Sequence, residues 1–213
     1  IAVVDCTGHG VPGAFLSIIA RSHLDKAIDA ENYQSAGSYL TTVNELLKET
    51  LSRSDQKNTS EEGFDGGVCI YYRKEQKLEF AGAKSSIFNV SGTGATETSG
   101  DRKSVGSTRM AADFAFTTHE ISSPVGAFVM LTDGITDVMS PEEKPIAFGR
   151  RRVIKILRES LDKTPSTIVK NIMRSVNLYR GDAPFRDDLT LLAFSLIEDD
   201  SELSTVSVVG EDS

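Results

Sequence analysis

Residues 5–14 of the chain read D-C-T-G-H-G-V-P-G-A, and the four residues before them are all apolar. The apolar run predicts a short buried strand that ends at the carboxylate of Asp5. The glycines that follow favour a tight turn, and Pro12 favours the first turn of a helix. This stretch therefore predicts a strand, a turn and a helix, with an acidic side chain where the strand ends.

Two further acidic positions occur in the same setting. The apolar run 128–131 leads to Asp133, and the pair Asp187-Asp188 stands directly before the apolar run that begins at Leu189. Mg²⁺ and Mn²⁺ prefer rigidly held oxygen ligands, and two such ions together can activate a water molecule. Three strand-end carboxylates from distant parts of the chain therefore predict a site for divalent cations.

The blocks D-C-T-G-H-G-V-P-G-A, L-T-D-G-I-T-D and R-D-D-L-T-L-L resemble the signature blocks of the PPM (PP2C-like) protein phosphatases, in the bacterial SpoIIE/RsbU-type branch. They follow the family's order over about residues 1–197. One block alone would be a common turn sequence, whereas three in order are specific. The resemblance implies an enzyme that dephosphorylates phosphoserine and phosphothreonine in partner proteins with two Mn²⁺ or Mg²⁺ ions.

The same resemblance implies metal-binding roles for individual residues. Asp5 would bridge both ions, with the backbone carbonyl of Cys6 as a further ligand, and Asp133 would bind the second ion. Aligned on the Leu-Thr that follows, the family's last ligand falls on Asp187. Asp188 is the alternative, because neighbouring residues of an extended chain point to opposite sides and only one of the two can face the site.

Two other positions have alternative interpretations. By resemblance, Asp65 would bind a third and weaker metal, but it also fits a turn residue beside two glycines. The pKa of a histidine suits proton transfer near neutrality, which makes His9 a candidate general acid. Because Cys6-Thr7 separates the aspartate from Gly-His, a structural role for His9 in the turn is the alternative.

The rest of the sequence predicts an α+β fold. Helical spacing of apolar residues predicts helices at about 12–29, 35–51 and 150–161, and one that Thr164 caps and Pro165 opens. Strands are expected near 68–72, 78–80, 86–90, 113–121, 126–132 and 189–197, with an exposed loop at 91–101. Short turns between strands imply antiparallel sheets. The resemblance refines this to a PP2C-like sandwich of two antiparallel β-sheets flanked by α-helices.

Composition narrows the possible partners. The chain has 213 residues and a net charge of −8, which argues against nucleic-acid binding. No apolar run approaches the roughly 18 residues that a membrane span needs, so we expect a cytoplasmic domain without membrane contact. Cys6 and Cys69 are expected to be reduced thiols.

Domain limits and partners follow from the same reasoning. We expect a phosphatase domain at 1–197 and an acidic tail without regular structure at 198–213. The chain begins inside a strand, and the family carries a Gly-Gly-Asp-aromatic block before this point. We therefore expect a piece of a longer protein that lacks its first strands and one carboxylate.

The resemblance implies a phosphorylated STAS-type anti-anti-sigma protein or a similar regulator as substrate. It also implies an upstream sensor, in some cases membrane-anchored. A homodimer is a further option. The alternatives are a pseudophosphatase that binds a phosphoprotein without turnover, and a hydrolase of small phosphate esters.

Overall fold

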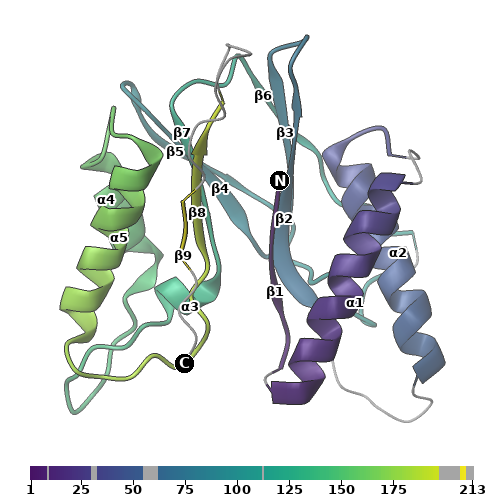
Figure 1. Ribbon diagram of the computed structural model, residues 1–213, viewed down its shortest axis with the longest axis horizontal. Coiled ribbons are helices and arrows are strands. Elements are labelled where there is room, and N and C mark those ends of the chain that lie inside the picture. The colour runs from purple at the N-terminus through teal and green to yellow at the C-terminus, as the bar shows by residue number, and fades with distance from the viewer. Residues whose placement is uncertain (9, 30–32, 55–61, 112, 197–206, 210–213) are drawn as a thin grey trace. The chain divides into compact units, whose positions relative to one another are not determined.

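Two antiparallel β-sheets, each with its own helices and apolar core, make up the part of the chain that the structure describes (Figure 1). This computed structural model describes residues 1–8, 10–29, 33–54, 62–111, 113–196 and 207–209. The first unit comprises residues 1–86 and 99–123, and the second comprises 87–98 and 124–213. In the described ranges, no helix has the length and apolar character needed to span a membrane.

The sheet of the first unit has the strand order β1-β2-β3-β6. Its strands are β1 (Ala2–Cys6), β2 (Phe64–Tyr72), β3 (Lys77–Ala83) and β6 (His119–Ser122). Helices α1 (Gly10–Asp29) and α2 (Ala36–Ser54) lie side by side over this sheet (Figure 1). Their buried faces hold the apolar positions that the helical spacing predicts, with Leu16, Ala20 and Leu24 on α1 and Leu40, Val43 and Leu47 on α2.

The sheet of the second unit has the order β5-β4-β7-β8-β9. Its strands are β4 (Ser86–Ser91), β5 (Gly94–Ser99), β7 (Ala127–Leu131), β8 (Leu191–Ser195) and β9 (Ser207–Val209). Helices α3 (Asp133–Thr136), α4 (Gly149–Arg158) and α5 (Pro165–Arg180) belong to this unit, and α5 packs on β7 and β8. As predicted, the Thr164 hydroxyl caps α5 by accepting the N–H of Thr167 at 3.3 Å.

The expectation of a loop at 91–101 was wrong, because residues 94–99 form β5 beside β4. The strand expected at 113–121 was too long, since β6 begins only at residue 119. The N–H of Phe116 donates to the Thr41 hydroxyl at 3.0 Å, and the N–H of Thr117 donates to Asp101 at 2.8 Å. These backbone groups therefore bond to side chains rather than to a neighbouring strand.

The predicted tail at 198–213 lies partly outside the described residues. Within it, residues 207–209 form β9, which pairs with β8. The limits of the phosphatase domain stay a prediction.

A buried carboxylate ties α2 to the sheet below it. Glu79 on β3 is 5% exposed, and its Oε2 accepts the N–H of Ala36, the first residue of α2, at 2.9 Å. The same carboxylate pairs with the ammonium of Lys77 at 2.9 Å. A carboxylate at a helix N-terminus satisfies an otherwise unpaired donor and opposes the helix dipole favourably.

We expect Glu79→Ala to lower the free energy of unfolding by about 2–3 kcal/mol, because it leaves the Ala36 N–H and the Lys77 ammonium without their buried partner. Urea unfolding would measure this. The matched control is Glu120→Ala, because Glu120 is 55% exposed and lies 4.0 Å from the same ammonium. Exposed pairs contribute little, so the control should change stability by less than about 0.5 kcal/mol. Equal losses for both variants would contradict this role of Glu79.

A histidine links α1 to α2. The Nε2 of His23 lies 2.9 Å from the hydroxyl of Thr50. Burial, with a smaller contribution from Lys26, lowers the pKa of His23, and Glu49 opposes this shift only in part. The unfolded chain, with an ordinary histidine pKa of about 6.5, therefore binds a proton more readily than the folded chain.

We expect the stability of the protein to fall as the pH drops below about 6.5, because protonation of His23 favours the unfolded chain. The fall should level off below the lowered pKa of the folded state. The measurement is the thermal midpoint between pH 5 and 8, compared with His23→Gln. The difference between the two proteins should depend on pH, and a constant difference would contradict the assignment.

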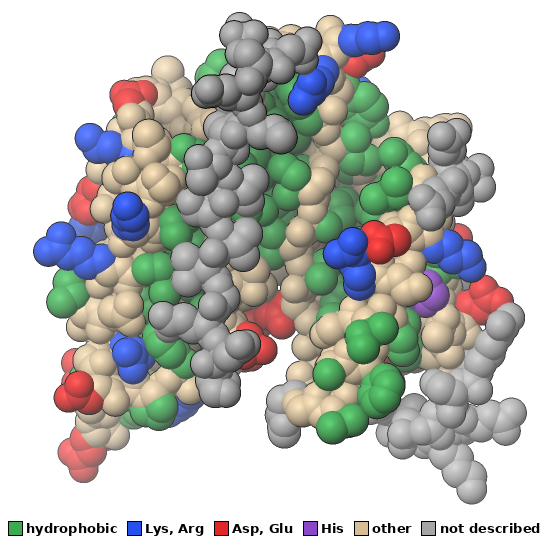
Figure 2. Space-filling view, in the orientation of Figure 1, with side chains coloured by type: hydrophobic (Ala, Val, Ile, Leu, Met, Phe, Trp, Pro, Cys, Tyr) green, Lys and Arg blue, Asp and Glu red, His purple; other side chains and the backbone are tan. Residues whose placement is uncertain are grey.

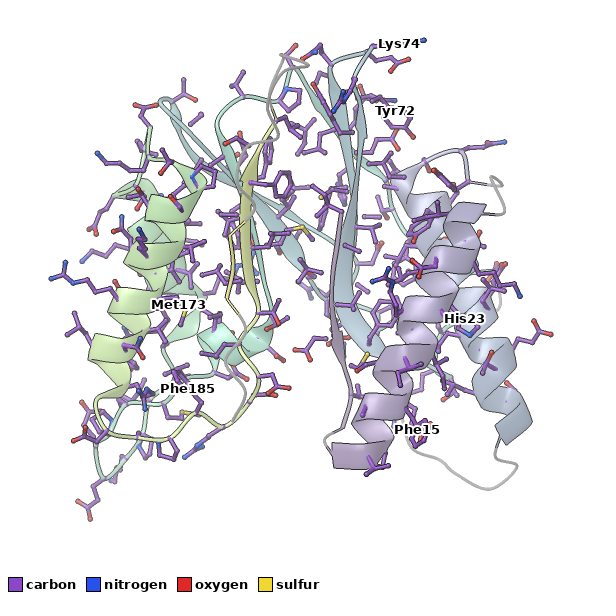
Figure 3. All side chains as sticks on the ribbon, viewed as in Figure 1. Phe15, His23, Tyr72, Lys74, Met173 and Phe185 are labelled. Carbon is purple, nitrogen blue, oxygen red and sulfur yellow. The ribbon has the colours of Figure 1, made fainter. Side chains whose placement is uncertain are left out.

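Part of α1 carries apolar side chains that the described residues leave exposed. Val11, Phe15 and Ile18 are between 62% and 71% exposed and recur at helical spacing. Figure 2 shows hydrophobic side chains over this end of the helix, and Figure 3 shows Phe15 pointing away from the sheet. Exposed apolar side chains that share a helix face are a common feature of protein contact surfaces.

Candidate active site

In the first unit, two acidic side chains lie opposite each other at the end of β1. Asp5 is the register partner of Asp65 on β2, and both side chains are half-buried. Asp65 Oδ2 lies 3.5 Å from the Lys84 ammonium, while its Oδ1 is buried and has no hydrogen-bond partner among the described residues. Like charges directly opposite on paired strands are destabilising, and a positive charge beside them, such as the Lys84 ammonium or a bound cation, offsets this repulsion.

Asp65 lies within a strand, so the alternative of a turn residue was wrong. The glycine beside it has a different function. A Cβ on Gly66 would lie 2.4 Å from the carbonyl oxygen of Val3, so only glycine lets β1 approach this closely. Gly66 therefore helps to set the register that places Asp5 opposite Asp65.

A threonine fastens the turn after Asp5 to the start of β2. The Thr7 hydroxyl accepts the N–H of Gly63 at 3.0 Å, and the N–H of Thr7 donates to the Gly63 carbonyl at 2.9 Å. Because Gly63 stands two residues before Asp65, these bonds hold together the two strand ends that carry the acids. No role was predicted for Thr7, although a threonine inside a glycine-rich turn is a signal for such a bond.

Cys6, a further predicted ligand, lies directly before Thr7. Cys6 ends β1, and both it and Cys69 are free cysteines, as predicted. Burial raises the pKa of the Cys6 thiol, with a smaller contribution from Asp5, and a hydrogen bond with Ser17 opposes the shift. A protonated thiol is a poor nucleophile. The candidate acid His9 lies outside the described residues.

In the second unit, two hydrogen bonds join the residue that follows β7 to the residue that precedes β8, just beyond the last pair of the ladder, Leu131 and Leu191. The N–H of Thr132 donates to the Thr190 carbonyl at 3.0 Å, and the N–H of Thr190 donates to the Thr132 hydroxyl at 3.2 Å. Thr132 is buried and is the N-cap of α3, so Asp133 begins that short helix with its side chain exposed. These bonds hold Asp133 next to the segment that carries the Asp187-Asp188 pair.

The backbone of this segment touches α3. A Cβ on Gly134 would lie 2.1 Å from the carbonyl oxygen of Asp188, so glycine is needed for the close approach. Asp187 and Asp188 are both exposed, and Oδ1 of Asp187 accepts the N–H of Asp188 at 2.8 Å. The structure thus places both candidate ligands, Asp187 and Asp188, at the end of the second unit's sheet where Asp133 lies.

The acidic side chains therefore occur in pairs at strand ends within each unit. In the ranges that the structure describes, no three His, Cys, Asp or Glu side chains form a metal-binding group. The donors themselves fit hard divalent cations, because they are carboxylates and one buried oxygen of Asp65 has no hydrogen-bond partner within the described part of the chain. The residues present are thus compatible with Mn²⁺ or Mg²⁺.

A cavity of about 560 Å³ in the first unit does not involve these acids. It is lined by residues of α1 and β2, by Ile1, Ala2 and Val4, and by Tyr33 and Tyr39. The size of this cavity is typical of ligand pockets, but neither Asp5 nor Asp65 is among the residues that line it.

Solved structures that are similar to this one identify the class of protein. The structure resembles the SiaA-PP2C domain of Pseudomonas aeruginosa, with a TM-score of 0.78 and 30% identity over 92% of this chain and 75% of that chain. It also resembles the catalytic domain of the serine threonine protein phosphatase PstP in complex with two manganese ions, with a TM-score of 0.57 and 12% identity over 90% of this chain and 85% of that chain.

A third similar structure contains the RsbU and RsbW domains of a Mycobacterium tuberculosis protein. Its TM-score is 0.61 and its identity 18%, over 90% of this chain and 50% of that chain. None of the curated proteins compared with the chain matches it.

The fold and the relatives define a protein serine/threonine phosphatase of the PP2C (PPM) type, and the α+β, PP2C-like fold predicted from the sequence is confirmed. The family model described as Stage II sporulation protein E (SpoIIE) matches residues 1–196. The chain belongs to the SpoIIE family.

Proposed function

We propose that this domain dephosphorylates a phosphorylated regulatory protein, with Asp5, Asp133 and Asp187 as ligands of two Mn²⁺ or Mg²⁺ ions. The observation that supports this most directly is the pairing of carboxylates at strand ends in each unit. Cys6 contributes its backbone carbonyl, and Asp188 is the alternative to Asp187. Asp65 is assigned to a third, weaker cation because one of its oxygens has no partner in the described part of the chain.

In this proposal the aspartates, the threonines beside them and His9 have different roles in the reaction. Bound Mn²⁺ or Mg²⁺ would lower the pKa of a water molecule and neutralise charge on the phosphoryl oxygens. The aspartates would hold the metal ions rigidly, because hydrogen bonds of Thr7 and Thr132 fix the backbone beside Asp5 and Asp133. His9 is assigned the role of the general acid, which donates a proton to the leaving serine or threonine oxygen. The alternative is a structural role for His9 in the turn.

The proposal also specifies the class of protein that is the substrate. Membership of the SpoIIE family and similarity to a structure with RsbU and RsbW domains support a regulatory phosphoprotein. We propose a protein of the STAS type, phosphorylated on serine or threonine. The homodimer, the cytoplasmic location and a membrane anchor in a longer protein stay predictions.

The test compares three substrates under the same metal conditions. A phosphorylated STAS-domain protein, a phosphoserine peptide of the same local sequence and p-nitrophenyl phosphate are each incubated with Mn²⁺, with Mg²⁺ or with EDTA. We expect metal-dependent release of phosphate, with kcat/KM highest for the folded phosphoprotein because it offers the largest contact surface.

Each other outcome contradicts part of the proposal. Full activity in EDTA would exclude the metal mechanism. Binding of the phosphoprotein without turnover, with Mn²⁺ present, would indicate a pseudophosphatase. Hydrolysis restricted to p-nitrophenyl phosphate would indicate a small-ester hydrolase.

A further inference from the structure

Lys84, in the turn between β3 and β4, has a backbone conformation that is unusual for lysine. Its φ of 47° lies in the left-handed region that favours glycine. The surrounding backbone holds this conformation, because the N–H of Lys84 donates to the Asp101 carbonyl at 2.7 Å and Ala83 is bridged to the same residue. A strained residue that the fold maintains suggests a use for its side chain.

The side chain of Lys84 reaches the acidic pair described above. Its ammonium lies 3.5 Å from Oδ2 of Asp65, which is the register partner of Asp5. The lysine side chain is 52% exposed, so this ion pair is largely solvated and weak. A lysine has a flexible stem and three N–H donors, so it can exchange one anionic partner for another at small cost.

We propose that Lys84 binds the phosphate group of the substrate beside Asp5, an inference that rests on the proposed function. Asp65 holds the ammonium in place while no substrate is bound. Once a cation balances the charge of the Asp5–Asp65 pair, Asp65 attracts the ammonium less, and Lys84 turns to the phosphoryl oxygens. The phosphate dianion is a stronger partner than a single carboxylate, because it offers more charge and more acceptor oxygens.

This assignment differs from a purely structural ion pair in what it predicts. A structural pair would affect stability and leave phosphate affinity unchanged. A phosphate-binding lysine affects the affinity for every phosphate ester and for inorganic phosphate itself. It acts equally on p-nitrophenyl phosphate and on a phosphoprotein, because the group recognised is the phosphate and not the protein around it.

The informative variant is Lys84→Gly, since glycine removes the ammonium and also suits the left-handed backbone. We expect its thermal midpoint to equal or exceed that of the wild type. The inhibition constant for inorganic phosphate, measured with saturating Mn²⁺, should rise about 10- to 100-fold, because a charge-assisted contact is lost. KM for p-nitrophenyl phosphate should rise similarly, and the Mn²⁺ affinity measured by calorimetry should not weaken.

Two controls separate this effect from a general loss of positive charge. Lys74 is exposed at the tip of the β2–β3 hairpin, where Figure 3 shows it at the far end of these strands, and Lys74→Gly should leave phosphate inhibition unchanged. Lys84→Arg keeps a cation and should retain phosphate affinity within a few-fold. If wild type and Lys84→Gly share the same inhibition constant and KM, the inference is overturned while the proposed function stands. If the wild type itself shows no metal-dependent hydrolysis, the proposed function fails.

Discussion

Asp133→Asn is expected to lower kcat by a factor of at least about 10², because it removes a charged ligand from the metal whose charge stabilises the transition state. The amide keeps the size of the side chain and its place at the start of α3, so the fold should survive. Steady-state hydrolysis of p-nitrophenyl phosphate over a range of Mn²⁺ concentrations measures the effect. The Mn²⁺ concentration needed for half-maximal activity should rise together with the loss of kcat.

The matched control is Asp137→Asn in the same short segment. Asp137 is exposed, follows α3 as its C-cap, and accepts the Thr136 hydroxyl at 3.3 Å. Removing its charge should leave both kcat and the Mn²⁺ dependence near wild-type values. His9→Ala should cost less than Asp133→Asn. If the order of these effects were reversed, the roles assigned to the acids and to His9 would be wrong.

The sequence was most informative where local chemistry decides the structure. Thr164 and Pro165 set the start of α5, and the run before Asp5 forms β1 as expected. The three acid-containing blocks identified the family because each stands at the end of a strand, where a short pattern of apolar, acidic and small residues is readable without knowledge of the partner strand.

The sequence was least informative where distant residues meet. The pairing of Asp5 with Asp65 depends on a register across almost sixty residues, and no local pattern specifies it. The ion pair of Asp65 with Lys84 depends in turn on that register and on an uncommon backbone conformation at the lysine. Strand β5 was missed for another reason, because its polar residues, 94–99, lack the alternation that marks a half-buried strand.

Gly134→Ala is expected to destabilise the protein by about 1–3 kcal/mol and to lower kcat/KM by up to about 10². Helix propensity alone predicts the opposite, since alanine is favoured over glycine inside a helix by about 1 kcal/mol. The close contact makes the change destabilising, because the added methyl group would lie 2.1 Å from the backbone oxygen of Asp188. A backbone carbonyl cannot rotate away as a side chain can, so the segment that carries Asp187 and Asp188 must move away from Asp133.

Gly149→Ala separates this clash from ordinary backbone strain. Gly149 begins α4 with a φ of +74°, and a Cβ there would meet no atom within 4 Å. Alanine at Gly149 should therefore cost about 1–2 kcal/mol through its left-handed backbone alone. It should leave Mn²⁺ dependence and kcat/KM unchanged, whereas Gly134→Ala should alter both at a similar loss of stability. Should the two variants lose stability equally and both keep full activity, the contact of α3 with Asp188 would have no part in positioning the acids, and the ligand assignment in this unit would have to be sought elsewhere in the chain.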